Sequence, residues 1–210
     1  MPAISQEQMM DLLEKCYDMA LQGIPGSKNC EDLAKDYLEK YIDPQVAAKK
    51  LVSNQVMKCS TSGFVSGLGG LITLPITIPA NIASVIYVQM RMVAAIAFMG
   101  GYDVHCDQVQ TLVYLCLVGT TITDIVKSTG VQVANKITIN MLKKLPGAVL
   151  TKINQKVGFR LITKFGTKGA INLVKMVPVA GAVVGAGMDF AGTKVIAQKA
   201  YDAFLKNEIV

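Results

Sequence analysis

The sequence predicts an all-α fold, a single compact bundle of about seven to nine helices whose apolar central segment is interrupted by Gly and Pro. The chain has 210 residues, enough to bury a sizeable core without disulfides or metals. Hydrophobic residues make up 51% of it and charged residues only 17%, so apolar faces must pack densely. Apolar residues recur at helical spacing, and no segment shows the alternation of a strand.

The N-terminal region is predicted to form three helices. Ser5 begins the first, and Gln8 three residues later completes a capping-box pattern. Ser27 is expected to cap the second helix. Asp43 and Pro44 are expected to begin the third, as its N-cap and its first helical residue. We expect residues 1–58 to pack on a helical core formed by residues 59–210, within one domain overall.

The middle of the chain holds the most apolar elements. Residues 59–90 contain no charged side chain, but Pro75 and Pro79 forbid one continuous helix there. A helix of about 20 residues is predicted over 80–99, ended by a Gly pair. Asp107 is expected to cap the next helix, which should run to about residue 127.

The C-terminal third is predicted to form further helices separated by Pro and Gly. The expected ranges are 131–145, 148–165, a short helix around 170–176, and 180–205.

The charges are segregated along the chain. Residues 1–43 carry nine acids and four lysines, a local charge of −5. Residues 125–188 carry ten Lys or Arg and no acid. A block this one-sided needs a counter-charge from anionic lipid, nucleic acid or an acidic surface of the protein itself. A related hypothesis is that the acidic region acts as a releasable cover on the basic block.

Four cations in this block are spaced four residues apart, which places them along one ridge of a helix. Like charges at this spacing repel by a few tenths of a kcal/mol. Near an anionic leaflet, by contrast, each contributes about 1 kcal/mol. We therefore expect basic helices 131–165 to contact anionic headgroups, an ordinary solvated face being the alternative. The residues predicted for this role are Lys136, Lys143, Lys144, Lys152, Lys156, Arg160 and Lys164.

The apolar segment 60–99 is predicted to form the core or a slot for acyl chains. Asn81, Gln89, Arg91 and Asp189 are predicted to form its polar seam. A central Arg costs about 2.5–3.5 kcal/mol in a membrane span, so this segment fits a polar-seamed bundle better than a lipid-exposed span. Asp189 lies in an apolar stretch and is expected to pair with Arg91 or a lysine.

One cluster, residues 103–107, combines several chemically capable side chains. Asp103 is predicted to form a turn and Asp107 to cap a helix, so both are structural. His105 is the only histidine, which leaves little material for a zinc site or a histidine-based triad. We predict no metal, no cofactor and no catalytic residue. The alternative is an enzyme acting on a lipid or small apolar substrate through Asp103, Asp107, Arg91 or Tyr87.

Three stretches resemble the EcsC family of bacterial proteins. They are GFVSGLGGLITLPITIPANIASVIYVQMRMVAAIAFMGGYD (63–103), TLVYLCLVG (111–119) and KINQKVGFRLITKFGTKGAINLVKMVPVAGAVVGAGMD (152–189), within a likeness running from about residue 30 to 205. The family pattern matches Pro75, Pro79, Gln89, Arg91, Gly101, Tyr102, Asp103 and Asp107. The resemblance implies a helical, membrane-associated protein without an established activity. The family is named for the third product of an ABC-transporter operon, so a membrane transporter is a candidate partner.

These observations predict a non-enzymatic membrane-associated or lipid-binding protein, peripheral to the cytoplasmic face of the cell membrane. Nucleic-acid binding through residues 125–188 is disfavoured, because Phe159 and Phe165 are the only aromatics there for base stacking. The five cysteines show no CxxC spacing and suit a reducing compartment. A second copy of the chain is a further candidate partner.

Overall fold

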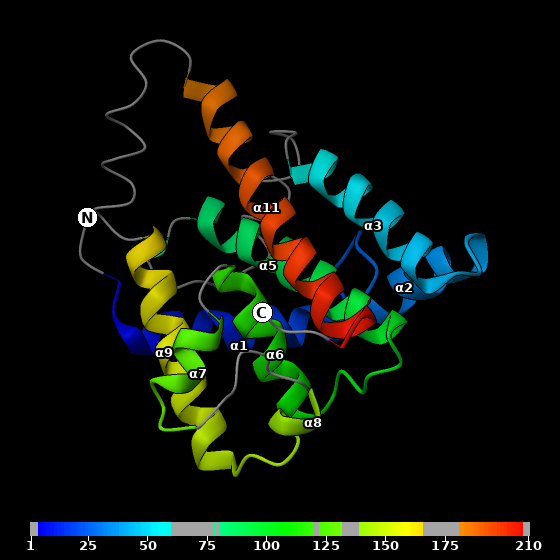
Figure 1. Ribbon diagram of the computed structural model, residues 1–210. Coiled ribbons are helices and arrows are strands. Elements are labelled where there is room, and N and C mark those ends of the chain that lie inside the picture. The colour runs from blue at the N-terminus through cyan, green and yellow to red at the C-terminus, as the bar shows by residue number, and fades with distance from the viewer. Residues whose placement is uncertain are drawn as a thin grey trace.

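The computed structural model describes residues 4–59, 78, 80–119, 122–131, 139–165 and 181–207. The described residues form helices and no strand, so the predicted all-α fold is confirmed (Figure 1). The helices are α1 Gln6–Gln22, α2 Cys30–Lys40, α3 Pro44–Cys59, α5 Ala80–Met99, α6 Asp107–Val118, α7 Ile122–Lys127, α8 Ile139–Leu142, α9 Gly147–Phe165 and α11 Gly181–Leu205.

Helix α5 lies at the centre of the bundle. It packs against α1, α2, α3, α6 and α11, and every residue from 86 to 97 is buried. A helix that is apolar nearly all round is stable in such a position because it has neighbours on every side. Its Ile82–Met99 stretch is the one part of the described chain long and apolar enough to cross a membrane. That stretch is 89% buried inside the bundle, as a core helix would be.

The caps of the first and third helices follow the sequence prediction. Ser5 Oγ accepts a hydrogen bond from Gln8 N, and Ser5 N donates to the Gln8 side chain, so the capping box is confirmed. Asp43 Oδ1 accepts from Gln45 N at 2.8 Å at the start of α3. The predicted cap at Ser27 is wrong, because Asn29 is the N-cap of α2 and Ser27 lies in the preceding turn.

The single helix expected from Asp107 to about residue 127 is two helices. Gly119 has φ +88°, a left-handed conformation that ends α6 at Val118. The predicted cap at Asp107 is also wrong. Cys106 is the N-cap and makes no side-chain capping bond, while Asp107 is the first helical residue. A carboxylate there still interacts favourably with the helix dipole.

The remaining helix predictions divide into three groups. Those over 80–99, 148–165 and 180–205 correspond to α5, α9 and α11. Of the helix expected over 131–145, only α8 is described as helical. The short helix around 170–176 and the Gly-rich segment 60–77 lie outside the described residues.

Helix α9 is held on the bundle by one apolar side. Leu150, Ile153, Val157 and Leu161 are buried, and α9 packs against α1, α6 and α7. Gly158 lets α1 approach closely, since a Cβ there would lie 2.9 Å from Met10 Sδ. This packing turns the opposite, basic side of α9 outward.

Candidate functional site

The outward side of α9 carries a line of cations. Lys152, Lys156, Arg160 and Lys164, here called the basic ridge, are all exposed. Phe159 lies beside the ridge and is 60% exposed, although it is a large apolar side chain. Exposed aromatics next to cations are typical of surfaces that contact a membrane interface.

Three of the ridge cations make no ion pair with any other described residue. Among the described residues, the ion pairs lie on other parts of the molecule, and none involves Lys152, Lys156 or Arg160. Lys164 is placed differently, because its Nζ lies 3.4 Å from the Leu117 carbonyl oxygen at the end of α6. A cation is favourable at a helix C-terminus, so Lys164 also has a structural role.

The acidic helix α1 does not cover the ridge. It packs against α9, but along the apolar side that holds Gly158. Its Asp11 pairs with Lys15 on the same helix at 2.8 Å. Within the described residues, α1 leaves these four cations exposed, and the hypothesis that residues 1–43 cover the whole basic block stays a prediction.

A pocket of about 450 Å³ opens beside the ridge. It lies between α9, the first turn of α1 and the turn that follows α7. Its walls are Gln6, Ser128, Thr129, Lys152, Gln155, Lys156 and Phe159. Two ridge cations and the exposed aromatic ring thus share one cavity with two hydroxyl groups. Gln6 Nε2 donates to the Gln155 carbonyl oxygen at 3.4 Å and joins the two sides of the pocket.

The other predicted lipid-contacting lysines are not placed on this ridge. Lys143 Nζ lies 5.8 Å from the ring centroid of Tyr102, in the connection between α5 and α6. Tyr102 in turn packs on Phe204 near the end of α11. Lys144 is exposed in the turn after α8, and Lys136 lies outside the described residues. Of the seven residues predicted to contact lipid, four therefore lie together on the ridge, and a role for the other three stays a prediction.

The residues predicted as a polar seam of the core contact different helices. Gln89 is buried and donates from Nε2 to Thr193 Oγ1 of α11 at 3.0 Å. Arg91, only 3% exposed, faces the other way, towards α2 and α3. It donates to Ser27 Oγ, to the Lys28 carbonyl oxygen and to Gln55 Oε1. The side chains of Asn81 and Asp189 lie outside the described residues.

The sequence did not single out the partners of Gln89 and Arg91. Ser27 was expected to cap a helix, and Thr193 and Gln55 are buried polar residues within α11 and α3. In the sequence, a polar residue on an otherwise apolar helical face indicates that a buried hydrogen-bond partner exists. It does not indicate which helix supplies that partner. The Arg91 guanidinium also lies 5.5 Å from the Tyr87 ring centroid. Burial raises the pKa of the Tyr87 hydroxyl.

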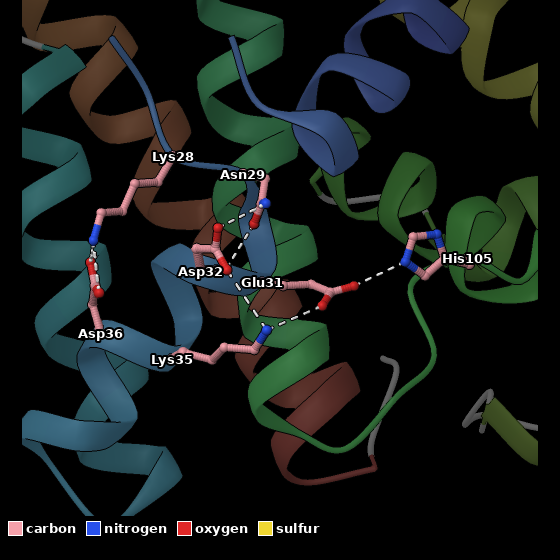
Figure 2. A network of polar contacts seen from close by, with 7 residues as sticks. All are labelled: Lys28, Asn29, Glu31, Asp32, Lys35, Asp36 and His105. Carbon is pink, nitrogen blue, oxygen red and sulfur yellow. Dashed lines mark hydrogen bonds and ion pairs between the residues drawn. The ribbon is translucent and has the colours of Figure 1, made fainter. Parts of the chain in front are cut away.

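In the cluster at residues 103–107, Asp103 bonds within the turn and His105 points towards α2, as Figure 2 shows for His105. Asp103 Oδ1 accepts from His105 N at 2.9 Å, so the predicted turn is confirmed. His105 Nε2 lies 2.9 Å from Glu31 Oε1 of α2, and Glu31 lies 3.6 Å from Lys35. These exposed contacts join the α5–α6 connection to α2. Within the described residues, no group of three or more His, Cys, Asp or Glu side chains is arranged to hold a metal.

Of the alternative catalytic residues, Tyr87 lies beside Arg91, but Asp103 and Asp107 lie apart from both. Arg91 is buried eight residues before the end of α5, about 12 Å along the helix axis from it. Asp103 and Asp107 are exposed beyond that end. Neither the pocket beside the ridge nor a second one at the ends of α5 and α11 is lined by any of these four residues.

The comparisons with known proteins give one result. The model of the EcsC protein family matches residues 1–206 of the chain. No curated protein and no solved structure matches it. The resemblance seen in the sequence is therefore confirmed, and the match extends beyond it to include α1.

Proposed function

The chain belongs to the EcsC protein family, and on that premise we propose that it is a non-enzymatic, membrane-associated protein that binds anionic lipid. The observation that carries the proposal is the outward side of α9, where exposed Lys152, Lys156 and Arg160 lie beside the exposed ring of Phe159. This helix lies within a stretch, residues 125–188, that contains no acid.

The expected electrostatic gain is large enough to matter. Each Lys or Arg near an anionic leaflet contributes about 1 kcal/mol, so three contribute about 3 kcal/mol, roughly a hundredfold in binding constant. Phe159 adds an apolar contact that salt does not screen. Binding through the ridge should weaken in salt, because the Debye length falls from about 10 Å at 0.1 M to about 3 Å at 1 M.

The apolar segment 60–99 has two proposed roles in this function. Its described part, α5, is surrounded by five other helices, which supports a role as the core that holds α9 in place. A slot for acyl chains is the second role, and it would involve residues 60–79. Gln89 and Arg91 would then join this core to α11, α2 and α3.

The proposed location is the cytoplasmic face of the cell membrane, to which the protein would be peripherally attached. The net charge of +6 and the acid-free block suit the anionic cytoplasmic leaflet. A membrane transporter and a second copy of the chain are proposed partners. Nucleic acid would meet the same cations, but Phe159 is the only strongly exposed aromatic ring on the ridge, which poorly supports base stacking.

Vesicle flotation tests the proposal. The wild-type protein should float with anionic vesicles and much less with zwitterionic ones, and high salt should release it. The variant carrying Lys152→Gln, Lys156→Gln and Arg160→Gln should bind anionic vesicles roughly a hundredfold more weakly. Salt-resistant binding to both kinds of vesicle would instead favour insertion of segment 60–99.

A matched control removes the same charge elsewhere. Lys40, Lys49 and Lys50 are exposed on α2 and α3, which lie across the molecule from α9 in Figure 1. Replacing all three by Gln should change anionic binding far less than the ridge variant does. If the two variants lost affinity equally, binding would reflect net charge rather than the ridge. If wild-type protein floated with neither kind of vesicle, the proposed function would be wrong.

A further inference from the structure

The hydroxyl groups in the pocket beside the ridge are oriented as acceptors. Ser128 Oγ donates its proton to the Ile125 carbonyl oxygen at 2.7 Å, and Thr129 Oγ1 donates to the Val126 carbonyl oxygen at 2.7 Å. A hydroxyl group has one proton and two lone pairs. Once the proton is used within the protein, the lone pairs remain for a donor that enters the pocket.

The two walls of the pocket, α9 and the turn after α7, therefore differ in chemistry. Lys152 and Lys156 supply positive charge and hydrogen-bond donors on the α9 side. Ser128 and Thr129 lie just after the C-terminus of α7, where helix carbonyl groups give a partial negative potential. A phosphate is favourable at the lysines and unfavourable at the α7 end. The α7 end suits a neutral group that donates hydrogen bonds.

Among the described residues, no acidic side chain lines the pocket. Glu7 and Asp124 are the acids nearest in sequence to the wall residues, and neither lines the cavity. The volume of about 450 Å³ lies within the range of about 300–1,000 Å³ usual for small-molecule sites. Phe159 also lines the pocket and is exposed, so an apolar chain attached to the anion would meet it.

We propose that this pocket binds a phosphoester bearing free hydroxyl groups, with its phosphate at Lys152 and Lys156 and its hydroxyls donating to Ser128 and Thr129. The headgroup of a lipid such as phosphatidylglycerol has this chemistry, and so does soluble glycerol phosphate. The inference rests on the proposed function and narrows its ligand from any anionic lipid to one with a hydroxyl-bearing headgroup.

Two lipids of equal charge test the hydroxyl requirement. Phosphatidylglycerol and phosphatidylmethanol both carry one negative phosphodiester, but only the first has free hydroxyls. Flotation of the full-length protein should favour phosphatidylglycerol vesicles about tenfold, the effect expected for two neutral hydrogen bonds. The Ser128→Ala, Thr129→Val variant should lose this preference while still binding both lipids. The Lys152→Gln, Lys156→Gln variant should weaken binding to both.

The remaining outcomes are separable. Calorimetry with soluble glycerol phosphate reports whether the free phosphoester binds. One outcome is that the wild-type protein binds glycerol phosphate, the Ser128→Ala, Thr129→Val variant does not, and the wild type shows no preference between the two lipids. That outcome would identify the soluble compound as the ligand. If wild-type protein binds the two lipids equally and glycerol phosphate not at all, this inference is wrong while the proposed function stands. If it binds no anionic vesicle, the proposed function fails as well.

Discussion

At Gly100, where α5 ends, the backbone of α11 passes unusually close. A Cβ at this position would lie 2.4 Å from the Phe204 carbonyl oxygen. At Gly158 a Cβ would also be crowded, at 2.9 Å, but by the sulfur of the Met10 side chain. A backbone oxygen within a packed helix cannot move aside, whereas a methionine can change rotamer. A side chain at Gly100 would therefore force the two helices apart, whereas a side chain at Gly158 would only force Met10 to move.

We predict that Gly100→Ala lowers the free energy of unfolding by about 1–3 kcal/mol, because the α5–α11 contact must open. Gly158→Ala is the matched control. Its gain in helix propensity, about 1 kcal/mol, offsets the cost of moving Met10, so stability should stay within about 1 kcal/mol of wild type. Urea unfolding of both variants measures the difference. Equal losses at the two positions would contradict the distinction between backbone and side-chain crowding.

This contact also shows where sequence reasoning stops at the residue scale. The Gly pair at 100 and 101 predicted the end of α5 correctly, because helix termination is local chemistry. The sequence did not predict that Phe204 lies against Gly100, since that contact joins residues 104 positions apart. The partners of Arg91 were missed for the same reason. Its bonds to Ser27 and Gln55 depend on how α2 and α3 pack on α5.

At the scale of a helix, α9 carries a conflict between stability and the proposed function. Lys152, Lys156 and Arg160 follow one another at i, i+4 spacing and repel in water. The conflict was visible in the sequence because it depends only on helical periodicity. The exposure of Phe159 and the pocket formed with α1 and α7 were not, since both depend on which side of α9 packs inward.

We predict that Lys156→Glu stabilises the protein and weakens its binding to anionic vesicles. The substitution turns two repulsive pairs, with Lys152 and Arg160, into two attractive ones. In each of the two pairs, losing the repulsion and gaining the attraction each contribute a few tenths of a kcal/mol. The expected total gain in the free energy of unfolding is about 1 kcal/mol at low ionic strength. Lys156→Gln removes the repulsion alone and should give about half the gain. Urea unfolding at low and high salt measures both, and a loss of stability in Lys156→Glu would contradict the argument.

At the scale of the whole molecule, the fold limits how the protein can meet a membrane. Helix α9 lies on one side of the bundle, and the α2–α3 connection with Ile42, 93% exposed, lies on the other (Figure 1). One flat bilayer cannot contact both sides of a rigid bundle. If α9 faces lipid, as we propose, the α2–α3 connection faces away from it. The sequence predicted the basic side of α9 but not which elements lie on the opposite side, because that depends on how all the helices pack.

Burial of cysteine and tyrosine side chains in the core also affects the stability of the protein at alkaline pH. Burial raises the pKa of Cys16, Cys30 and Cys116 from the ordinary 9.0 to about 12. It also raises the pKa of the Tyr17 and Tyr114 hydroxyls. The folded protein keeps these protons at a pH where the unfolded chain has begun to lose them. The stability they contribute is fully present below about pH 9 and is lost as the pH rises above it.

We therefore predict that the free energy of unfolding falls steeply above about pH 9, with each buried thiol contributing a slope of about 1.4 kcal/mol per pH unit. Cys116→Ala removes one such thiol from α6. The free energy of unfolding of this variant should therefore fall with pH less steeply than that of the wild type, by about the slope of one thiol. Val113→Ala on the same helix is the control, because it removes buried volume without a titrating group. It should be less stable at every pH with an unchanged slope. Urea unfolding at about pH 7.5, 9 and 10 measures all three proteins, and identical slopes would show that burial of Cys116 does not hold its proton.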